Sequence, residues 1–303
     1  MRSIVAPGQG SQSAGMLTPW LALPGAAERV AAWSEQTGLD LEHLGTAAEA
    51  EQVTDTAVAQ PLIVAVGLLA WEQLRQDGFA VDAETVVAGH SIGELTAAAV
   101  AGVITSDEAV RLAAIRGGAM AKACALAPTG MSALLGGDEE AVLARLAELG
   151  LVPANRNAKG QIVAAGPLDS LEALKADPSA GARIRTLSVA GAFHTEHMAT
   201  AREAVAEAVA ALRPSDPVAI LLSNADGQAV RSGAEVLARI VTQVTSPVRW
   251  DLCQATMREL GVDTMTELPP AGTLSAIAKR ELPETNTHAV KKVEDLALVA
   301  DLG

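Results

Sequence analysis

The sequence predicts an α/β fold with a mainly parallel sheet and a small inserted subdomain. Short apolar runs alternate with longer amphipathic ones along the chain, which is the pattern of strands and helices in turn. Half of the 303 residues are hydrophobic, enough for a sizeable core. A chain of this length buries roughly 75% of its unfolded surface and corresponds to about two domains, or one large domain with an insertion.

The first part of the chain is predicted to begin with a short strand that stops at Pro7-Gly8. The apolar runs that follow predict a buried helix, a central strand and two further helices. The expected elements are a strand over 3–6, a helix over 57–76, a strand over 84–89, a helix over 92–101 and a helix over 106–125.

The pattern changes at Pro128-Thr129-Gly130. The next elements are expected at 131–135, 138–149, 152–157, 161–165, 168–176 and 183–188, in the order β-α-β-β-α-β, which is the ferredoxin-like unit. We therefore predict a small subdomain over 128–189, inserted into a larger domain formed by 1–127 and 190–303. The larger domain should resume with a helix over 196–212, a strand over 217–223, helices over 232–243 and 249–260, a strand over 263–268, a helix over 273–281, a strand over 288–293 and a terminal helix.

Composition excludes several functional classes. The net charge of −14, with two Phe, four Trp and no Tyr, argues against binding to nucleic acid or an anionic membrane. The two cysteines, Cys124 and Cys253, form no disulfide framework or metal cluster and are predicted to be buried thiols. The N-terminus lacks a signal-peptide pattern, and the longest apolar run, 62–71, is about half a membrane span. We expect a cytoplasmic protein with no cofactor and no metal.

Gly89-His90-Ser91-Ile92-Gly93 matches G-x-S-x-G, between a predicted strand and a predicted helix. This is the context of a nucleophile elbow, in which the serine hydroxyl is presented on a sharp turn. Free N–H groups at the helix N-terminus would then stabilise an oxyanion. The alternative is an ordinary turn with a capping serine.

A glycine-rich segment, Pro7-Gly8-Gln9-Gly10-Ser11-Gln12, also follows a strand. A dinucleotide loop would need glycine where Ser13 stands. A plain turn and a loop that supplies a second oxyanion N–H both remain open.

A nucleophilic serine needs a base, and histidine is the usual one. His194 is favoured because it follows a strand and a loop. His197, one helical turn later, is the typical solvated residue, and a metal site at His194-Thr195-Glu196-His197 lacks further ligands. His43 and His288 stand in polar stretches, and His90 should point away from the serine.

Arg116 borders the apolar side of its predicted helix. A surface arginine with a buried stem is the common explanation. The other is a guanidinium that binds a carboxylate inside a pocket.

Taken together, the motifs resemble the malonyl-CoA:acyl carrier protein transacylase family of dissociated fatty acid and polyketide synthesis, and its actinobacterial form most of all. The matches extend from residue 6 to about 282. They are Pro7-Gly8-Gln9-Gly10-Ser11-Gln12, Gly89-His90-Ser91-Ile92-Gly93-Glu94, Arg116-Gly117, Asn155-Arg156-Asn157 with Gly160-Gln161-Ile162-Val163, Ala192-Phe193-His194, and Gln243 before Ser246-Pro247-Val248-Arg249-Trp250.

This resemblance implies a hydrolase-like core and a ping-pong transfer of malonyl from coenzyme A to the pantetheine thiol of acyl carrier protein. It implies Ser91 as nucleophile and His194 as base, with the main-chain carbonyl of Gln243 orienting the histidine in place of an acidic residue. The remaining implied roles are oxyanion N–H groups from Gln9 and Ile92, a carboxylate partner in Arg116, substrate contacts from Asn157, and malonyl selectivity from Phe193.

Other functions share parts of this pattern. A serine thioesterase or esterase, the malonyl-loading subunit of a malonate decarboxylase, and a non-catalytic acyl-binding subunit are the alternatives. Acyl carrier proteins are typically acidic, so docking on this acidic chain would need a local basic patch. The candidates are Arg156, Lys159, Arg183 and Arg185.

Overall fold

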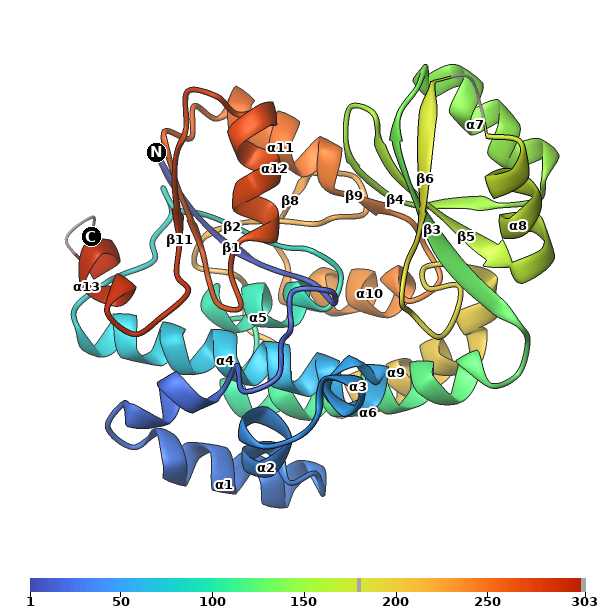
Figure 1. The fold of residues 1–303 in the computed structure, drawn as a ribbon. Helices are drawn as coiled ribbons and strands as arrows, with labels where there is room; N and C mark the ends of the chain where they lie inside the picture. The colour runs from blue at the N-terminus through green and yellow to red at the C-terminus, as the bar shows by residue number, and fades with distance from the viewer. Residues whose placement is uncertain (179–180, 301–303) are drawn as a thin grey trace.

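The computed structural model describes residues 1–178 and 181–300 and contains two sheets, which stand side by side (Figure 1). The larger sheet has six strands, and all neighbours from β11 to β7 are parallel, whereas β8 is antiparallel to β7. Its spatial order is β11 (Asn286–Ala289), β10 (Thr264–Glu267), β1 (Arg2–Ala6), β2 (Val86–Gly89), β7 (Ile220–Leu222) and β8 (Ala229–Val230). The predicted mixed α/β class is confirmed.

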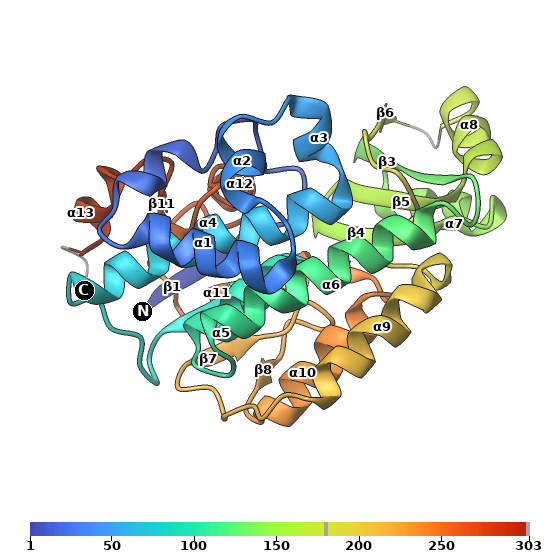
Figure 2. The same cartoon turned by 90° about the horizontal axis from the view of Figure 1, so that it is seen from below.

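Alternate residues of the central strands enter two different cores, one on each face of the large sheet. Ile4 and Val87 join the core formed with α4 (Thr56–Gln76), α5 (Gly93–Val100) and α6 (Ser106–Cys124). Val5 and Val86 join the core formed with α11 (Trp250–Glu259) and α12 (Thr273–Glu281). The sheet is therefore sandwiched between helices, as buried parallel strands require. Figure 2 shows α4 and α6 running side by side on one face.

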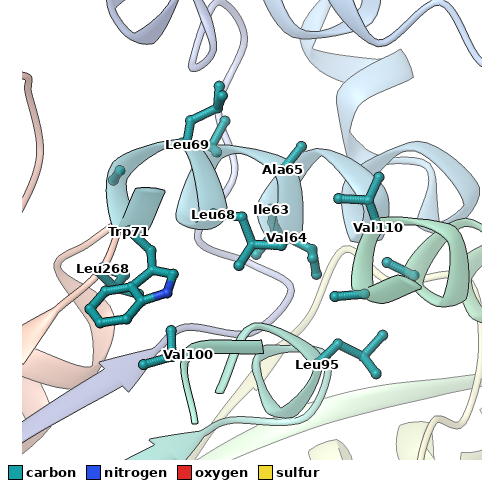
Figure 3. Packing of buried hydrophobic residues seen from close by; sticks show 14 of the residues in the cluster. Ile63, Val64, Ala65, Leu68, Leu69, Trp71, Leu95, Val100, Val110 and Leu268 are labelled. Atoms are coloured by element: carbon teal, nitrogen blue, oxygen red, sulfur yellow. The ribbon is translucent and has the colours of Figure 1, made fainter. Parts of the chain in front are cut away.

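Helix α4 is buried on all sides from Ala59 to Trp71 and forms the centre of the larger core (Figure 3). It is the one helix within residues 1–178 and 181–300 whose length and mean hydropathy of 1.5 would allow a membrane crossing, but 78% of that window is buried inside the protein. Such a helix is typical of a core position. Its residues Ile63, Leu68 and Trp71 pack against neighbours that include Val110 of α6 and Leu268.

The smaller sheet is built from the segment that the sequence assigns to an inserted subdomain. Its order is β6-β3-β5-β4-β9, and the first four strands are antiparallel to their neighbours. The elements are β3 (Thr129–Gly136), α7 (Glu139–Glu148), β4 (Val152–Ala158), β5 (Gln161–Pro167), α8 (Leu168–Ala176) and β6 (Ala182–Thr186). They enclose a separate core, which includes Leu134 and Leu174. A fifth strand, β9 (Val248–Arg249), pairs parallel with β4 from outside this segment.

The structure adds helices where the sequence analysis assigns no element, between residues 7 and 56. These are the 3₁₀ helix η1 (Thr18–Ala22), α1 (Ala26–Thr37), α2 (Leu41–Thr46) and α3 (Ala50–Thr54). The buried Ala26, Val30 and Trp33 of α1 have i, i+4, i+7 spacing, a helical signal that was available in the sequence.

After the small subdomain, most predicted elements are found with shifted ends. The predicted helix over 196–212 divides into a 3₁₀ turn, η2 (Glu196–Met198), and α9 (Ala199–Ala210). The strand predicted over 288–293 is β11, which begins earlier, at Asn286. The two remaining helices of this part of the chain are α10 (Gly233–Gln243) and α13 (Asp295–Ala300). β8 and β9, each of two residues, are too short to be recognised from sequence.

Candidate active site

The turn between β2 and α5 has the geometry of a nucleophile elbow. Ser91 adopts φ 53°, a left-handed conformation that is unfavourable for a residue with a side chain. Glycine is required on both sides of it. A Cβ on Gly89 would lie 2.1 Å from the carbonyl carbon of Gly93, and one on Gly93 would lie 2.2 Å from the carbonyl oxygen of Ala6. The motif therefore forms a strained turn, and the alternative of an ordinary capped turn does not fit.

His194 reaches Ser91 from a different part of the chain. Its Nε2 lies 2.8 Å from Ser91 Oγ, and its Nδ1 lies 2.8 Å from the main-chain oxygen of Gln243 at the end of α10. Because a carbonyl oxygen only accepts, Nδ1 carries the proton and donates it to Gln243. Nε2 is then free to accept the hydrogen of the serine hydroxyl. The tautomer is the one that a general base requires.

Burial keeps the His194 imidazole neutral. The side chain is 3% exposed, and desolvation, followed by the positive charge of Arg116, lowers the pKa of His194 to about 3. Both causes disfavour a second proton on the ring. At neutral pH the resting site therefore holds a neutral base beside the serine, and a histidine is protonated there only when a negative charge develops next to it.

Arg116 is inside the protein, so the explanation of a surface arginine is wrong. Its side chain is 1% exposed. It donates to Gln60 Oε1 at 2.7 Å, to Gln243 Oε1 at 2.8 Å and to Ser91 Oγ at 3.2 Å. Desolvation lowers the pKa of Arg116 to about 10, which still leaves the guanidinium charged at neutral pH. A buried cation thus lies in hydrogen-bond contact with the hydroxyl of Ser91.

Three residues of this network were not singled out from the sequence. Gln60 of α4 binds Arg116, and Asn224, after β7, accepts the Ser91 N–H through Oδ1 at 2.9 Å. Glu94 of α5 accepts from the main-chain N–H of Asn224 at 2.7 Å and from the side chain of Gln243. Desolvation raises the pKa of Glu94 to about 7. The usable signal for Glu94 was a charged residue in an otherwise apolar helix, Ile92 to Val100.

The glycine-rich loop after β1 lies directly against the elbow. A Cβ on Gly8 would come within 2.8 Å of both the side chain and the main-chain oxygen of His90. The main-chain N–H groups of Gln9 and Ile92 have no hydrogen-bond partner within residues 1–178 and 181–300. The Gln9 side chain instead bonds Thr56 at 3.1 Å. The loop and the elbow thus bring two free donors to the same region.

Ser91 and His194 open into a cavity of about 230 Å³ between the elbow and the small sheet. Gly8 and Gln9 form one side, Asn157 and Val163 of the small sheet another, and α12 a third. Phe193, 6% exposed, lines the cavity next to His194. Asn157 Oδ1 lies 2.9 Å from His90 Nε2. The elbow alone does not enclose this site, because the inserted segment supplies much of its wall.

The remaining histidines and the cysteines depart from the expectations in one respect. His90 lines the same cavity as Ser91, but its ring bonds Asn157 and packs against Trp250 and makes no hydrogen bond to the serine among the described residues. Cys124 is half-buried, not buried, whereas Cys253 is buried. His43 and His197 are exposed. Within the described ranges, no three His, Cys, Asp or Glu side chains gather in a way that suits a metal ion.

A comparison with models of protein families identifies the family to which this chain belongs. The model of the acyl transferase domain matches residues 4–302. The chain belongs to the acyl transferase domain family. This acyl transferase is 59% identical over 302 residues to the malonyl CoA-acyl carrier protein transacylase of Mycobacterium tuberculosis, with 100% of both chains covered.

Two solved structures extend the likeness to three dimensions. The crystal structure of MCAT from Mycobacterium tuberculosis matches with a TM-score of 0.96 over 99% of each chain, at 59% identity. A malonyl-transacylase in complex with its type II PKS acyl-carrier protein matches with a TM-score of 0.91 at 29% identity, over 100% of this chain and 99% of the other.

Proposed function

We propose that this acyl transferase moves a malonyl group from coenzyme A to the pantetheine thiol of acyl carrier protein, through malonyl-Ser91. The observation that carries the proposal is the buried guanidinium of Arg116, 3.2 Å from Ser91 Oγ. An acyl group on this serine is delivered beside a fixed positive charge, so an acyl group that ends in a carboxylate is favoured. The full-length relatives named malonyl CoA-acyl carrier protein transacylase support the same substrate.

The first half-reaction forms the acyl-enzyme. Ser91 Oγ attacks the thioester carbonyl while its proton passes to His194 Nε2. The tetrahedral oxyanion is stabilised by the main-chain N–H groups of Gln9 and Ile92. The thiolate of coenzyme A leaves and takes the proton from His194. The Gln243 carbonyl, at 2.8 Å from Nδ1, holds the ring and favours the imidazolium that forms between the two steps.

The second half-reaction regenerates the free hydroxyl of Ser91. The pantetheine thiol of the carrier gives its proton to His194 and attacks malonyl-Ser91. The new thioester forms, and Ser91 Oγ leaves with the proton from His194. Coenzyme A and carrier pantetheine share the same thiol-bearing arm, so one cavity serves both half-reactions in turn.

Arg116 accounts for the preference for a charged acyl group. Its Nε is buried and has no partner among the described residues, so the guanidinium has a donor left to give. A neutral acetyl group has no negative charge to pair with the guanidinium, whereas a carboxylate forms an ion pair with it. Breaking a buried charge pair typically costs about 3–5 kcal/mol. Phe193, beside the base, narrows the cavity and supports malonyl over branched acyl groups, and Asn157 is proposed as a further substrate contact.

The carrier should dock on the small subdomain. Its Lys159, Arg183 and Arg185 are exposed and suit an acidic partner. Arg156 is not available for this role, because it pairs with Glu139 and lies 3.9 Å from Asp251. The docking patch is therefore reduced to three cations.

The finer architectural assignment is also a proposal. The catalytic domain is hydrolase-like and consists of 1–127 and 190–303, and the ferredoxin-like subdomain is 128–189; 179–180 and 301–303 lie outside the described residues. The β6-β3-β5-β4 order supports this division. We place the enzyme in the cytoplasm and assign it no cofactor; its two free cysteines fit a reducing compartment.

Intact mass spectrometry after mixing with malonyl-CoA tests the proposal. We expect one malonyl adduct on Ser91, absent in Ser91→Ala and strongly reduced in Arg116→Ala. Arg111→Ala is the matched control, because Arg111 lies on the same helix but is exposed, and its adduct should form normally. No adduct on the wild-type chain would refute the proposal.

Acceptor choice separates the alternatives. Adding acyl carrier protein with its pantetheine arm should discharge the adduct onto the carrier thiol. Release of free malonate instead would indicate a thioesterase, and selective transfer to the carrier subunit of a malonate decarboxylase would indicate that enzyme. A chain that binds malonyl-CoA without becoming acylated would be a non-catalytic acyl-binding subunit.

A further inference from the structure

Glu94 is a buried carboxylate to which the steps above give no task. It stands three residues after the nucleophile, in the first turn of α5, and is 7% exposed. A carboxylate is costly to bury unless it is hydrogen-bonded and compensated by charge. Glu94 Oε1 accepts from Asn224 N at 2.7 Å, and Oε2 accepts from Gln243 Nε2. Arg116 supplies the compensating charge, one side chain further away.

Both partners of Glu94 hold the backbone of Ser91. Asn224 accepts the Ser91 N–H through Oδ1 at 2.9 Å, and Gln243 Nε2 donates to the Ser91 carbonyl oxygen at 3.0 Å. A residue strained to φ 53° persists only where its surroundings determine it fully. Asn224 and Gln243 hold Ser91 in this conformation, and each is hydrogen-bonded to one carboxylate oxygen of Glu94.

Glu94 also determines which way the Gln243 amide faces. The amide oxygen accepts from Arg116 at 2.8 Å, and the amide nitrogen donates to Glu94 and to the Ser91 oxygen. The opposite orientation would place oxygen against a carboxylate and a carbonyl, and NH₂ against a guanidinium. Above about pH 7, the raised pKa of Glu94, the carboxylate is ionised and only accepts, so it excludes that arrangement.

We propose that Glu94 is a positioning residue of the acyl-transfer site: it holds Asn224 and the amide of Gln243, and through them the Ser91 turn and the Arg116 guanidinium. The inference rests on the proposed function for its choice of malonyl-CoA as a probe. It predicts that loss of Glu94 weakens reaction with a charged acyl donor more than reaction with a neutral one, since the Ser91 turn serves both donors but pairing of Arg116 with an acyl carboxylate serves only the charged one.

The test is Glu94→Gln, which keeps size and removes the acceptor-only character. Its amide can satisfy Asn224 N or Gln243 Nε2 but not both, so one buried donor faces another. Two rates are compared: acylation of Ser91 by malonyl-CoA, and labelling of Ser91 by phenylmethylsulfonyl fluoride, which is uncharged. We expect the malonyl rate to fall about 10- to 100-fold, the range that a buried unsatisfied donor implies, and the labelling rate to fall by a clearly smaller factor.

Glu267→Gln is the matched control. Glu267 is also buried and accepts main-chain N–H groups, but it does so at the start of α12, and its contacts include neither Ser91 nor Gln243. This variant should be less stable yet keep the wild-type ratio of the two rates. An equal fall of both rates in Glu94→Gln, or no fall, would overturn the assignment.

A double-mutant cycle with Gln243→Met isolates the path to Arg116. If Glu94 acts on Arg116 through Gln243, the loss of malonyl preference in the double variant should be no larger than in Gln243→Met alone; additive losses would contradict this. If Glu94→Gln fails to fold, Glu94→Asp takes its place in the same cycle. A wild-type chain labelled by the sulfonyl fluoride but not acylated by malonyl-CoA would refute the proposed function, whereas an unchanged ratio in the variants refutes only the role of Glu94.

Discussion

β2 and β10 flank β1 in parallel, and both end at the same edge of the large sheet in a turn that enters a helix. After β2, the strained Ser91 is held by Asn224, Gln243 and His194, all more than 100 residues away in sequence. At the end of β10, Glu267 accepts the N–H groups of Gly272, Leu274 and Ser275, all within eight residues.

The two turns use a buried glutamate in opposite ways. Glu267 neutralises the free N–H groups at the start of α12, a local cap that stabilises one helix. Glu94 ties together side chains from distant elements next to a buried cation. A buried glutamate that accepts hydrogen bonds from nearby backbone N–H groups has a structural role. One that accepts them from distant elements around a strained residue has a functional role.

The largest expected effect is at the β2 turn. His194→Ala removes the base and should lower the rate of malonyl transfer at least about 10⁴-fold, the scale seen when a serine enzyme loses its catalytic base. The thermal midpoint should change little by comparison, since the chemistry and not the scaffold is removed. His197→Ala is the control, because His197 is exposed and three residues away, and its rate should match the wild type. Equal losses in both variants would contradict the assignment of the base.

The second effect is at the β10 turn and concerns stability. Glu267→Gln leaves one of the buried N–H groups of α12 facing an NH₂, which should lower the free energy of unfolding by about 1–3 kcal/mol. Calorimetric melting is the measurement, with Glu281→Gln, at the half-buried last residue of the same helix, as the comparison. A loss of malonyl transfer without a loss of stability would break the contrast between the two glutamates.

The smallest effect is one of pH. Because burial and Arg116 lower the pKa of His194 to about 3, the base stays neutral in mildly acidic buffer. Labelling of Ser91 by phenylmethylsulfonyl fluoride should therefore fall less than about 3-fold between pH 8 and pH 5, whereas a free imidazole of ordinary pKa would lose about 30-fold. A titration near the ordinary histidine pKa would show that the imidazole is solvated.

The lowered pKa of His194 should also make the free energy of unfolding depend on pH. The folded-state pKa of His194 is lower than its unfolded value of 6.5, so the unfolded chain takes up the proton first as the pH falls. Stability is lost from about pH 6.5 downward. Glu94, whose pKa is raised from 4.5 to about 7, contributes in the opposite direction, because its folded form takes up a proton first. His194→Gln should therefore flatten the acid side of the stability curve.

Much of this site was visible in the sequence because its signals are local. The glycines at 89 and 93 are needed at fixed distances from Ser91, and each has a steric reason in the fold. The strands and helices from β3 to β6 were recognisable from the order of short periodic runs. His194 could be preferred over His197 because of its place after a loop, and the two differ in the structure as buried and exposed residues.

Arg116 shows where sequence reasoning stops. Its position on a helix permitted either a surface or a buried guanidinium, and periodicity could not distinguish them. The structure places Gln60 and Gln243 around it, from helices 56 and 127 residues away. The same holds for Arg156, which stands among the candidate docking cations but is paired with Glu139.

The sequence by itself determined the alternation of strands and helices and the sharp turn at Ser91, and it singled out Ser91 and His194 as the candidate nucleophile and base, because these depend on side-chain sterics and on neighbours within a few residues. The tertiary structure decided which polar groups are removed from water together. Burial and long-range contacts set the charge states of His194, Arg116 and Glu94, and they exist only once α4, α5, α6 and α10 have packed around the elbow.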